Sequence, residues 1–262
     1  MGVPALTRAA AHGLLRPTLR GPVLSTPSHG ISVVVPARNE EGNLKAAVHT
    51  VMEALADVTA DWEIVIVDDG STDGTGALAD RLASELPNVR ALHNAPALGF
   101  AGAYRRGAGV ASKAYVALVP GDNEIQPMSI RGMLEAVGTA DIVVPVTVNQ
   151  HERPWLRRAL SRSFTTLVNT LFGLRMTYFQ GPTVYPAELL RRLPTSTRGF
   201  VFLTEMLVRA LSTGHRAVEV PMYIQPRQYG ASSAVSLYNV VSALFTLAIL
   251  VRDIKLRRRP LG

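Results

Sequence analysis

One stretch of this chain constrains its fold more than any other: residues 65–75 read Val-Ile-Val-Asp-Asp-Gly-Ser-Thr-Asp-Gly-Thr. Three consecutive β-branched residues predict a strand that is buried on both faces, as in a parallel sheet. The Asp-Asp-Gly turn places short acceptors at the carboxyl end of that strand, where open α/β sheets bind ligands. These carboxylates suit the N–H and hydroxyl donors of a nucleoside, although a turn whose Asp and Ser cap the next helix gives the same pattern.

Two further segments show an apolar strand that ends in a polar turn. Residues 31–36 (Ile-Ser-Val-Val-Val-Pro) precede Ala-Arg-Asn-Glu-Glu-Gly, in which Asn39 is expected to cap a helix. Residues 114–119 (Ala-Tyr-Val-Ala-Leu-Val) precede Pro-Gly-Asp-Asn-Glu. Such strands, separated by helical segments, predict an α/β fold: a mostly parallel central sheet, flanked by helices, with one ligand-binding edge.

The order of these motifs resembles that of family 2 glycosyltransferases with the GT-A fold, in the branch of dolichol-phosphate mannose synthases and other polyprenyl-phosphate glycosyltransferases. The resemblance implies an inverting enzyme that moves a sugar from a nucleotide-diphosphate sugar, GDP-mannose or a UDP-hexose, to a polyprenyl or dolichyl phosphate at a membrane surface. The matching segments are Val-Val-Val-Pro-Ala-Arg-Asn-Glu (33–40), Val-Asp-Asp-Gly-Ser-Thr-Asp-Gly-Thr (67–75), Asn94 with Leu-Gly-Phe-Ala-Gly-Ala (98–103), Gly-Asp-Asn-Glu (121–124), Gly-Phe (199–200) with Glu-Met-Leu (205–207), and Arg-Gln-Tyr-Gly-Ala-Ser (227–232).

The resemblance also implies a divalent cation, Mg²⁺ or Mn²⁺, that neutralises the leaving diphosphate. Relatives usually hold it with Asp-x-Asp, whereas this chain has Pro120, Gly121 and Asp122 at that place, with Glu124 two residues later. Asp122 and Glu124 still offer two carboxylates, which are the hard oxygen ligands that these ions prefer. We expect both to be catalytic metal ligands. The missing first aspartate leaves a catalytically degenerate nucleotide-binding subunit as an alternative.

By the same resemblance, the turns after the first two strands form a nucleoside pocket. Its expected members are Pro36, Arg38, Glu40, Val67, Asp69 and Gly121. Asp69 is expected to accept from a base N–H, and Arg38, which replaces an aromatic residue of relatives, can stack on the base. Asp68 and Asp73 fit helix capping as well as ligand binding. Gly99 and Gly102 are expected to allow close backbone approach, as glycine does beside phosphates.

The acceptor side is expected to grip a lipid phosphate with Arg157, Ser161 and Arg227, since the guanidinium fork forms paired charge-assisted hydrogen bonds with phosphate. A lysine that relatives have in the last loop is replaced by Ser233. A soluble or polysaccharide acceptor is therefore the alternative. Such an alcohol would need a general base, for which Glu205 is the candidate, unless it pairs with the residue four positions later on the same helix.

The net charge of +7 lies at the two ends of the chain. Residues 1–30 carry three arginines and no acidic residue, and residues 252–262 carry five basic residues against one acidic residue. The segment between them is balanced, with 19 residues of each sign. The basic ends lack the interleaved aromatic platforms of nucleic-acid-binding proteins. We therefore expect an anionic membrane surface as the partner and no nucleic acid.

Three regions follow from these patterns. Residues 1–30 lack an apolar run and predict a disordered basic arm, with an organelle transit peptide as the alternative. Residues 31–233 are expected to form the catalytic GT-A glycosyltransferase domain. Residues 234–262 contain a 17-residue apolar stretch (235–251) that is short for a membrane span, so an interfacial helix with a basic tail is expected. A helix packed on the domain is the alternative. The expected location is the cytoplasmic face of a membrane, peripheral or monotopic.

Overall fold

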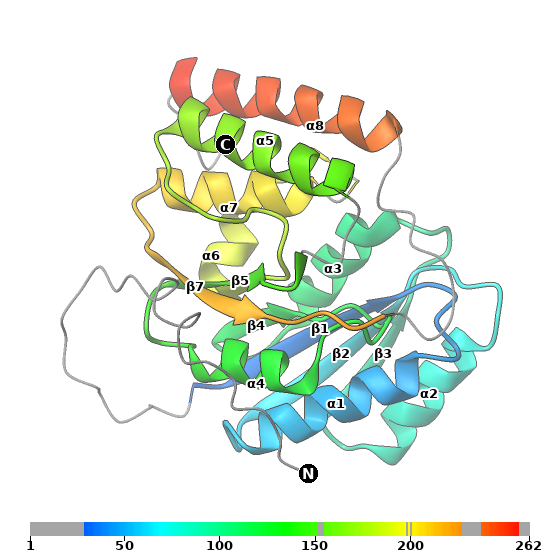
Figure 1. The fold of residues 1–262 in the computed structure, drawn as a ribbon. Coiled ribbons are helices and arrows are strands. Elements are labelled where there is room, and N and C mark those ends of the chain that lie inside the picture. Colours follow the sequence, from blue (N-terminus) through cyan, green and yellow to red (C-terminus); the bar gives the residue numbers. More distant parts are fainter. Residues whose placement is uncertain (1–28, 151–154, 198, 200, 227–236, 257–262) are drawn as a thin grey trace, which may run out of the picture.

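The computed structural model describes residues 29–150, 155–197, 199, 201–226 and 237–256, arranged around one central sheet (Figure 1). The sheet has seven strands in the order β3-β2-β1-β4-β6-β5-β7. Nearly all of the predicted basic arm and the last six residues lie outside the described residues. The strands are β1 (Ile31–Ala37), β2 (Trp62–Asp68), β3 (Val89–His93), β4 (Tyr115–Leu118), β5 (Ile142–Thr147), β6 (Val184–Pro186) and β7 (Ala217–Met222).

The predicted mostly parallel sheet is confirmed. β1 pairs in parallel with β2 and with β4, β2 pairs in parallel with β3, and β5 pairs in parallel with β7. Only the short β6, among the strands that the structure describes, runs antiparallel to its neighbours. Every residue of β1 and the β-branched run of β2 are buried, as expected for strands covered on both faces.

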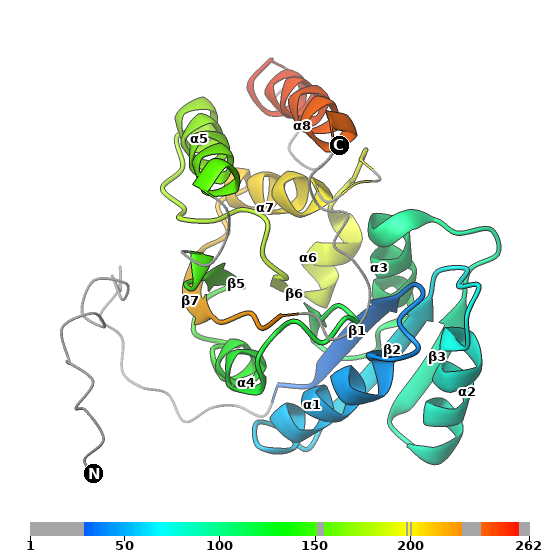
Figure 2. The ribbon, with the colours of Figure 1, turned by 45° about the vertical axis from the view of Figure 1, so that its right-hand side comes forward.

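Helices cover one face of the sheet with an apolar layer from α1 (Leu44–Ala56), α2 (Thr75–Glu85) and α4 (Pro127–Glu135). Their buried side chains, such as Leu44, Val48 and Ile130, pack on Val33, Val35 and other residues that point to this face. Burial of these aliphatic groups is the main source of stability on this side. The two views of the ribbon show these helices together below the sheet (Figures 1 and 2).

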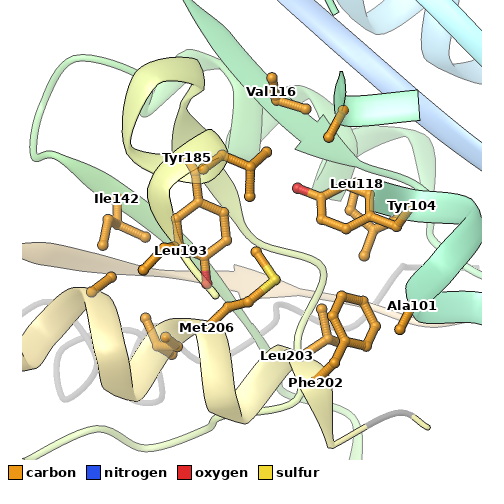
Figure 3. Close-up of a cluster of buried hydrophobic side chains, with 14 of the residues drawn as sticks. Ala101, Tyr104, Val116, Leu118, Ile142, Tyr185, Leu193, Phe202, Leu203 and Met206 are labelled. Atoms are coloured by element: carbon orange, nitrogen blue, oxygen red, sulfur yellow. The ribbon is translucent and has the colours of Figure 1, made fainter. Parts of the chain in front are cut away.

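The opposite face is covered by α3 (Gly99–Val110), α6 (Ala187–Arg192) and α7 (Phe202–Ser212). Tyr104, Tyr185 and Phe202 form the centre of this second apolar cluster (Figure 3). Gly107 lets α3 approach the sheet closely, because a Cβ there would lie 2.4 Å from Val34 Cγ1. Two more helices, α5 (Trp155–Phe172) and α8 (Leu237–Leu250), form an outer layer beyond α7 (Figures 1 and 2).

The C-terminal apolar stretch forms α8 and continues as a π-helical segment, η2 (Val251–Leu256). Leu247 and Leu250 are buried in the second cluster and Ile254 packs against it, whereas Leu244 and Phe245 are exposed. The helix thus packs on the domain by one side and leaves apolar side chains on another. Within the described ranges, no helix has the length and apolar character needed to cross a membrane.

Candidate active site at the carboxyl ends of β1, β2 and β4

The sheet brings four of the expected nucleotide-binding residues together where β1, β2 and β4 end. Pro36 is the register partner of Val67 in the β1–β2 ladder. The Gly121 N–H donates to the Pro36 carbonyl at 3.0 Å, and the Asp69 N–H donates to the Ala37 carbonyl at 2.9 Å. A Cβ on Gly121 would lie 3.1 Å from Ala37 Cβ, so this close approach favours glycine.

Asp69 organises one wall of this edge. Its side chain is 3 % exposed, and Oδ1 accepts from Asn94 Nδ2 and from the Leu98 N–H, both at 2.7 Å. Oδ2 accepts from the Gly99 N–H at 2.7 Å, at the amino end of α3, where a carboxylate is favoured by the helix dipole. Within the described part of the chain Oδ2 accepts this one bond, so it has room for a further donor such as a base N–H.

The backbone conformation explains why residue 99 is a glycine, and the sequence did not predict this explanation. Gly99 adopts a φ of 76°, a conformation that favours glycine, and its N–H is already bound to Asp69. The geometry therefore accounts for Gly99 as part of the turn into α3 and gives no support to the expected phosphate contact.

The turns after β1 and β2 are joined side by side. The Asn39 N–H donates to Ser71 Oγ at 3.0 Å, and Asn39 Oδ1 accepts from the Thr72 N–H at 2.8 Å. The expectation that Asn39 caps the following helix is wrong. Asn39 has a φ of 56° and its side chain binds the neighbouring turn, while α1 begins only at Leu44. Tertiary hydrogen bonds here replace the local capping interaction.

For Asp73 the structure supports the capping role and not a ligand-binding role. Its Oδ1 accepts from the Thr75 N–H at 3.0 Å and from Thr75 Oγ1 at 2.6 Å at the start of α2, and its Oδ2 accepts from the Glu41 N–H at 3.4 Å. Burial favours a higher pKa for Asp73, but the hydrogen bonds from Thr75 and Glu41 outweigh it and lower the pKa. Asp73 therefore shapes the turn. Glu40 Oε2 accepts from Asn43 Nδ2 at 2.7 Å, and Arg38 is exposed at the rim.

Asp68 takes part in a buried-to-surface chain with His93 and Asp80. Asp68 Oδ1 accepts from the Ser71 N–H at 3.1 Å, and His93 lies 3.1 Å from Asp68 Oδ2 and 2.9 Å from Asp80 Oδ1. The hydrogen bonds to Asp68 and Asp80 raise the pKa of His93. Burial would raise the pKa of Asp68, but its bonds to Ser71 and His93 prevail and lower it. The hydrogen bonds of Asp68 are therefore to other residues of the protein, which fits its structural alternative.

Asp122 and Glu124 lie in the turn after β4, both half-buried. Asp122 Oδ1 accepts from the Glu124 N–H at 3.2 Å, across Asn123, whose φ is 56°. The Glu124 carbonyl accepts from the Gln225 N–H at 2.7 Å, which ties this turn to the segment after β7. No cluster of three or more His, Cys, Asp or Glu side chains suited to a metal occurs among the residues with assigned positions. Two carboxylates in one turn fit an ion whose remaining ligands are substrate phosphates and water.

Of the three residues expected to bind the acceptor phosphate, two lie on α5 and one lies outside the described residues. Arg157 and Ser161 are half-buried in the first turns of α5, four positions apart and hence on one face of the helix. In Figure 1 the amino end of α5 points to the side of the molecule where β1 ends. Arg227 and Ser233 lie outside the described residues, so their expected roles stay predictions.

Glu205 forms an ion pair with Arg209, four positions later on the same helix, which was the alternative to its role as a general base. Its carboxylate is fully buried and accepts from Ser196 Oγ at 2.8 Å, Thr197 Oγ1 at 2.8 Å and Arg209 Nη2 at 3.1 Å. These bonds, with those from the backbone N–H groups of Ser196 and Thr197, occupy both oxygens. A carboxylate held in this way is not available to an acceptor hydroxyl.

Sequence reasoning missed Arg106 on α3. Its Nη1 donates to the His93 carbonyl and to Asn94 Oδ1, which orients the Asn94 amide so that Nδ2 meets Asp69. The Arg-Arg pair at 105–106 in an otherwise small and apolar helix was the available signal. Its partners come from another loop, which composition does not reveal.

A mostly parallel sheet with a carboxylate-lined edge at β1, β2 and β4 fits the class of nucleotide-diphospho-sugar transferases with the GT-A fold. Comparison with known proteins agrees. Residues 32–194 match the profile described as "Glycosyl transferase family 2". The chain belongs to this family and is a glycosyltransferase.

Two relatives match over most of their length. The polyprenol monophosphomannose synthase of Mycolicibacterium smegmatis is 31% identical over 87% of this chain and 89% of its own. The undecaprenyl-phosphate mannosyltransferase of Micrococcus luteus is 31% identical over 77% of this chain and 86% of its own. A crystal structure of glucosyl-3-phosphoglycerate synthase from Mycobacterium tuberculosis, with Mn²⁺, UDP-glucose and phosphoglyceric acid, is 19% identical, covers 84% of this chain and 80% of its own, and has a TM-score of 0.62. At that identity the structural likeness supports the fold.

Proposed function

We propose that this protein transfers a mannosyl group from a nucleotide-diphosphate sugar to a polyprenyl phosphate at a membrane surface. The observation that carries the proposal is that two relatives named for this transfer to polyprenol or undecaprenyl phosphate each match more than three quarters of the chain. The family match over residues 32–194 includes β2, β4 and all of β1 except its first residue, the strands that form the carboxylate-lined edge. Such extended similarity does not favour the degenerate-subunit alternative.

The residues of the edge have distinct roles in this proposal. Pro36 provides an apolar floor for the base, with Gly121 next to it, and Arg38 at the rim stacks on the base. Val67 was expected to pack on the base, but its side chain is fully buried in the second apolar cluster under α3, so it supports the pocket from within the core. Asp69 Oδ2 accepts a base N–H, and Glu40 faces the ribose. The pocket then fixes the donor so that its diphosphate reaches the turn after β4. Positioning of the two reactants supplies much of the rate enhancement in such transfers.

Asp122 and Glu124 fit a divalent cation, because both are carboxylates in one half-buried turn. They are the residues that would hold Mg²⁺ or Mn²⁺, and such an ion stabilises the negative charge of a leaving diphosphate when bound. The structurally similar glucosyl-3-phosphoglycerate synthase was crystallised with Mn²⁺. Because Pro120 replaces the first aspartate of the Asp-x-Asp motif, Asp122 and Glu124 would be the carboxylate ligands from this turn.

The acceptor is proposed to be a phosphate rather than an alcohol. A phosphate oxygen is already anionic near neutral pH, so it can form the new bond to the anomeric carbon while the bond to the diphosphate breaks, with inversion. Glu205, the base that an alcohol acceptor would require, is fully buried with both oxygens occupied. Arg157 and Ser161 on α5 are proposed to hold the lipid phosphate, together with Arg227.

The outer layer of helices supplies the proposed membrane contact. Trp155 on α5 is 71% exposed and Phe245 on α8 is 66% exposed, and they are accompanied by exposed Leu156, Leu160 and Leu244. Both helices lie beyond α7, on the side away from the sheet (Figure 2). Apolar side chains next to arginines such as Arg162 suit the interface of an anionic bilayer. The location proposed is the cytoplasmic face of a membrane, as a peripheral protein.

The test is mannosyl transfer by the full chain to polyprenyl phosphate in anionic vesicles, with GDP-mannose and UDP-glucose as alternative donors and Mg²⁺ or Mn²⁺ present. We expect a lipid-linked mannose and an activity that chelation abolishes. Asp122→Ala should lower turnover by at least about two orders of magnitude, because the loss of leaving-group neutralisation costs several kcal/mol. Glu53→Gln, an exposed change on α1, is the matched control.

Two results would contradict the proposal. Nucleotide binding without turnover under any donor would support the degenerate subunit. Transfer to a soluble or polysaccharide hydroxyl, but not to lipid phosphate, would overturn the acceptor class.

A further inference from the structure

Arg209 on α7 connects two carboxylates that lie far apart in the sequence. Its side chain is 2 % exposed. Nη2 donates to Glu205 Oε1 at 3.1 Å and to Asp253 Oδ2 at 3.0 Å, and Nε donates to Glu205 Oε1 at 3.2 Å. A buried guanidinium is costly unless acceptors surround it; Glu205 neutralises its charge and Asp253 supplies a further charged acceptor. Arg209 thus binds the C-terminal segment η2 to α7.

On its inner side this network reaches the catalytic half of the molecule. Glu205 accepts from the backbone and side chains of Ser196 and Thr197, and so fixes the loop before α7. The neighbouring Thr195 carbonyl accepts from Arg105 Nη1 on α3 at 3.2 Å. The amino end of α3 is the one that Asp69 holds at the nucleotide edge. A continuous series of polar contacts therefore extends from η2 to α3.

On its outer side the network ends in the segment with exposed apolar residues. Asp253 also accepts from Arg252 Nε at 2.8 Å. Leu250 and Ile254 pack inward around it, whereas Phe245 and Leu256 are exposed. The helix changes from α to π at Val251, just before this contact. Such π-helical turns are rare and often mark functional positions.

We propose that Asp253 is a positioning residue that latches the membrane-facing helix to α7 and so fixes the angle at which the catalytic edge meets the lipid surface. The inference rests on the proposed function. Stability alone is a weak reason for this arrangement, because a well-packed apolar contact stabilises a fold as well as a buried ion pair does. What a directional ionic contact adds is a single defined geometry.

The experiment compares Asp253→Asn with wild type on two acceptors: a long-chain polyprenyl phosphate in anionic vesicles and a short-chain, water-soluble polyprenyl phosphate. The variant keeps the Glu205–Arg209 pair, which is neutral overall. We expect vesicle sedimentation and short-chain transfer to stay within about twofold of wild type, while the vesicle reaction slows roughly tenfold, as for the loss of one charge-assisted hydrogen bond. Asp253→Glu should recover part of the rate. Glu135→Gln, which breaks an exposed ion pair with Arg131 on α4, is the matched control.

Hydrogen exchange of the full chain provides a readout that needs no activity. Asp253→Asn should speed exchange at 242–256 and at 196–197 and leave β1 and β2 unchanged. Unchanged exchange in both segments would overturn the latch. An equal loss of rate on both acceptors, or no loss on either, would overturn its orienting role. If wild type transfers to neither lipid, the proposed function fails, and the exchange result still decides whether the latch exists.

Discussion

At the scale of single residues, Asp69 has an observed structural role and, in the proposed function, a ligand-binding role as well. Three protein donors converge on its carboxylate, and an amide at this place would turn an N–H toward the Gly99 or Leu98 N–H. We expect Asp69→Asn to lower the free energy of unfolding by about 1–3 kcal/mol and to weaken nucleotide-diphosphate binding. Urea unfolding and calorimetry with GDP and UDP measure the two effects. Wild-type stability combined with lost affinity would mean that the carboxylate serves the ligand alone.

His93 makes a pH-dependent contribution to stability. Its pKa is raised in the folded state by Asp68 and Asp80, so its contribution is complete below its unfolded pKa, about 6.5, and is lost as the pH rises through the folded value. The advantage of wild type over His93→Gln should therefore shrink between about pH 6 and about pH 8.5. The change should be below about 1 kcal/mol, since 42% of the His93 side chain is exposed and solvent screens the pairs.

Urea unfolding of both proteins at the two pH values checks this. Asp80→Asn should remove part of the effect, because it deletes the exposed partner alone. An advantage that is constant or grows with pH would contradict the assignment.

For single residues, the sequence predicted where a strand ends better than it predicted which residues form hydrogen bonds with one another. The end of β2 was predictable because Val65, Ile66 and Val67 favour a buried strand and the Asp-Asp-Gly that follows favours a turn; the strand ends one residue into that run, at Asp68. The partners of Asp69 and Asn39 were not, because they lie on loops 25 to 33 residues away that only the tertiary fold brings close.

At the scale of elements, α3 contains an unusual buried hydroxyl. Tyr104 packs with its ring centroid 5.8 Å from that of Phe202 (Figure 3), and its hydroxyl has no hydrogen-bond partner among the described residues. A buried, unpartnered hydroxyl costs about 1–3 kcal/mol, so Tyr104→Phe should raise the free energy of unfolding. Thermal and urea unfolding test this. A marked loss of stability would instead reveal a partner, such as a buried water molecule.

The elements also show what periodicity can and cannot predict. The strands and the helices between them follow from apolar pattern and turn residues. Helix α8 was predicted as apolar, but whether it would pack on the domain or face a membrane depends on α7, whose Arg209 meets Asp253 only in the folded chain. In the structure Leu250 is buried against the domain and Phe245 is exposed, so the helix packs on the domain and its interfacial role stays a prediction.

At the scale of the whole molecule, two features bear on attachment to a lipid surface: the basic residues at the ends of the chain and the exposed apolar side chains. In the sequence the excess positive charge belongs to residues 1–30 and 252–262, and most of the exposed large apolar side chains of the described residues lie on α5, α8 and η2. In the proposed function, insertion of these apolar groups and attraction of the basic residues to anionic headgroups add, and together they hold the protein at a lipid surface.

The two contributions can be separated by substitution. Trp155→Ser and Phe245→Ser change side chains that are exposed in the fold, so they should leave unfolding unchanged and weaken vesicle binding by about 1.5–3 kcal/mol each, the value of burying a large apolar side chain. Replacing Arg257, Arg258 and Arg259 with Gln should weaken binding by about 1 kcal/mol per charge and make it less sensitive to salt. Vesicle sedimentation at two ionic strengths measures both. Met128→Ser, an exposed change on α4, is the control and should have no effect, whereas equal losses at Met128 and Phe245 would mean that no one face is directed at the membrane.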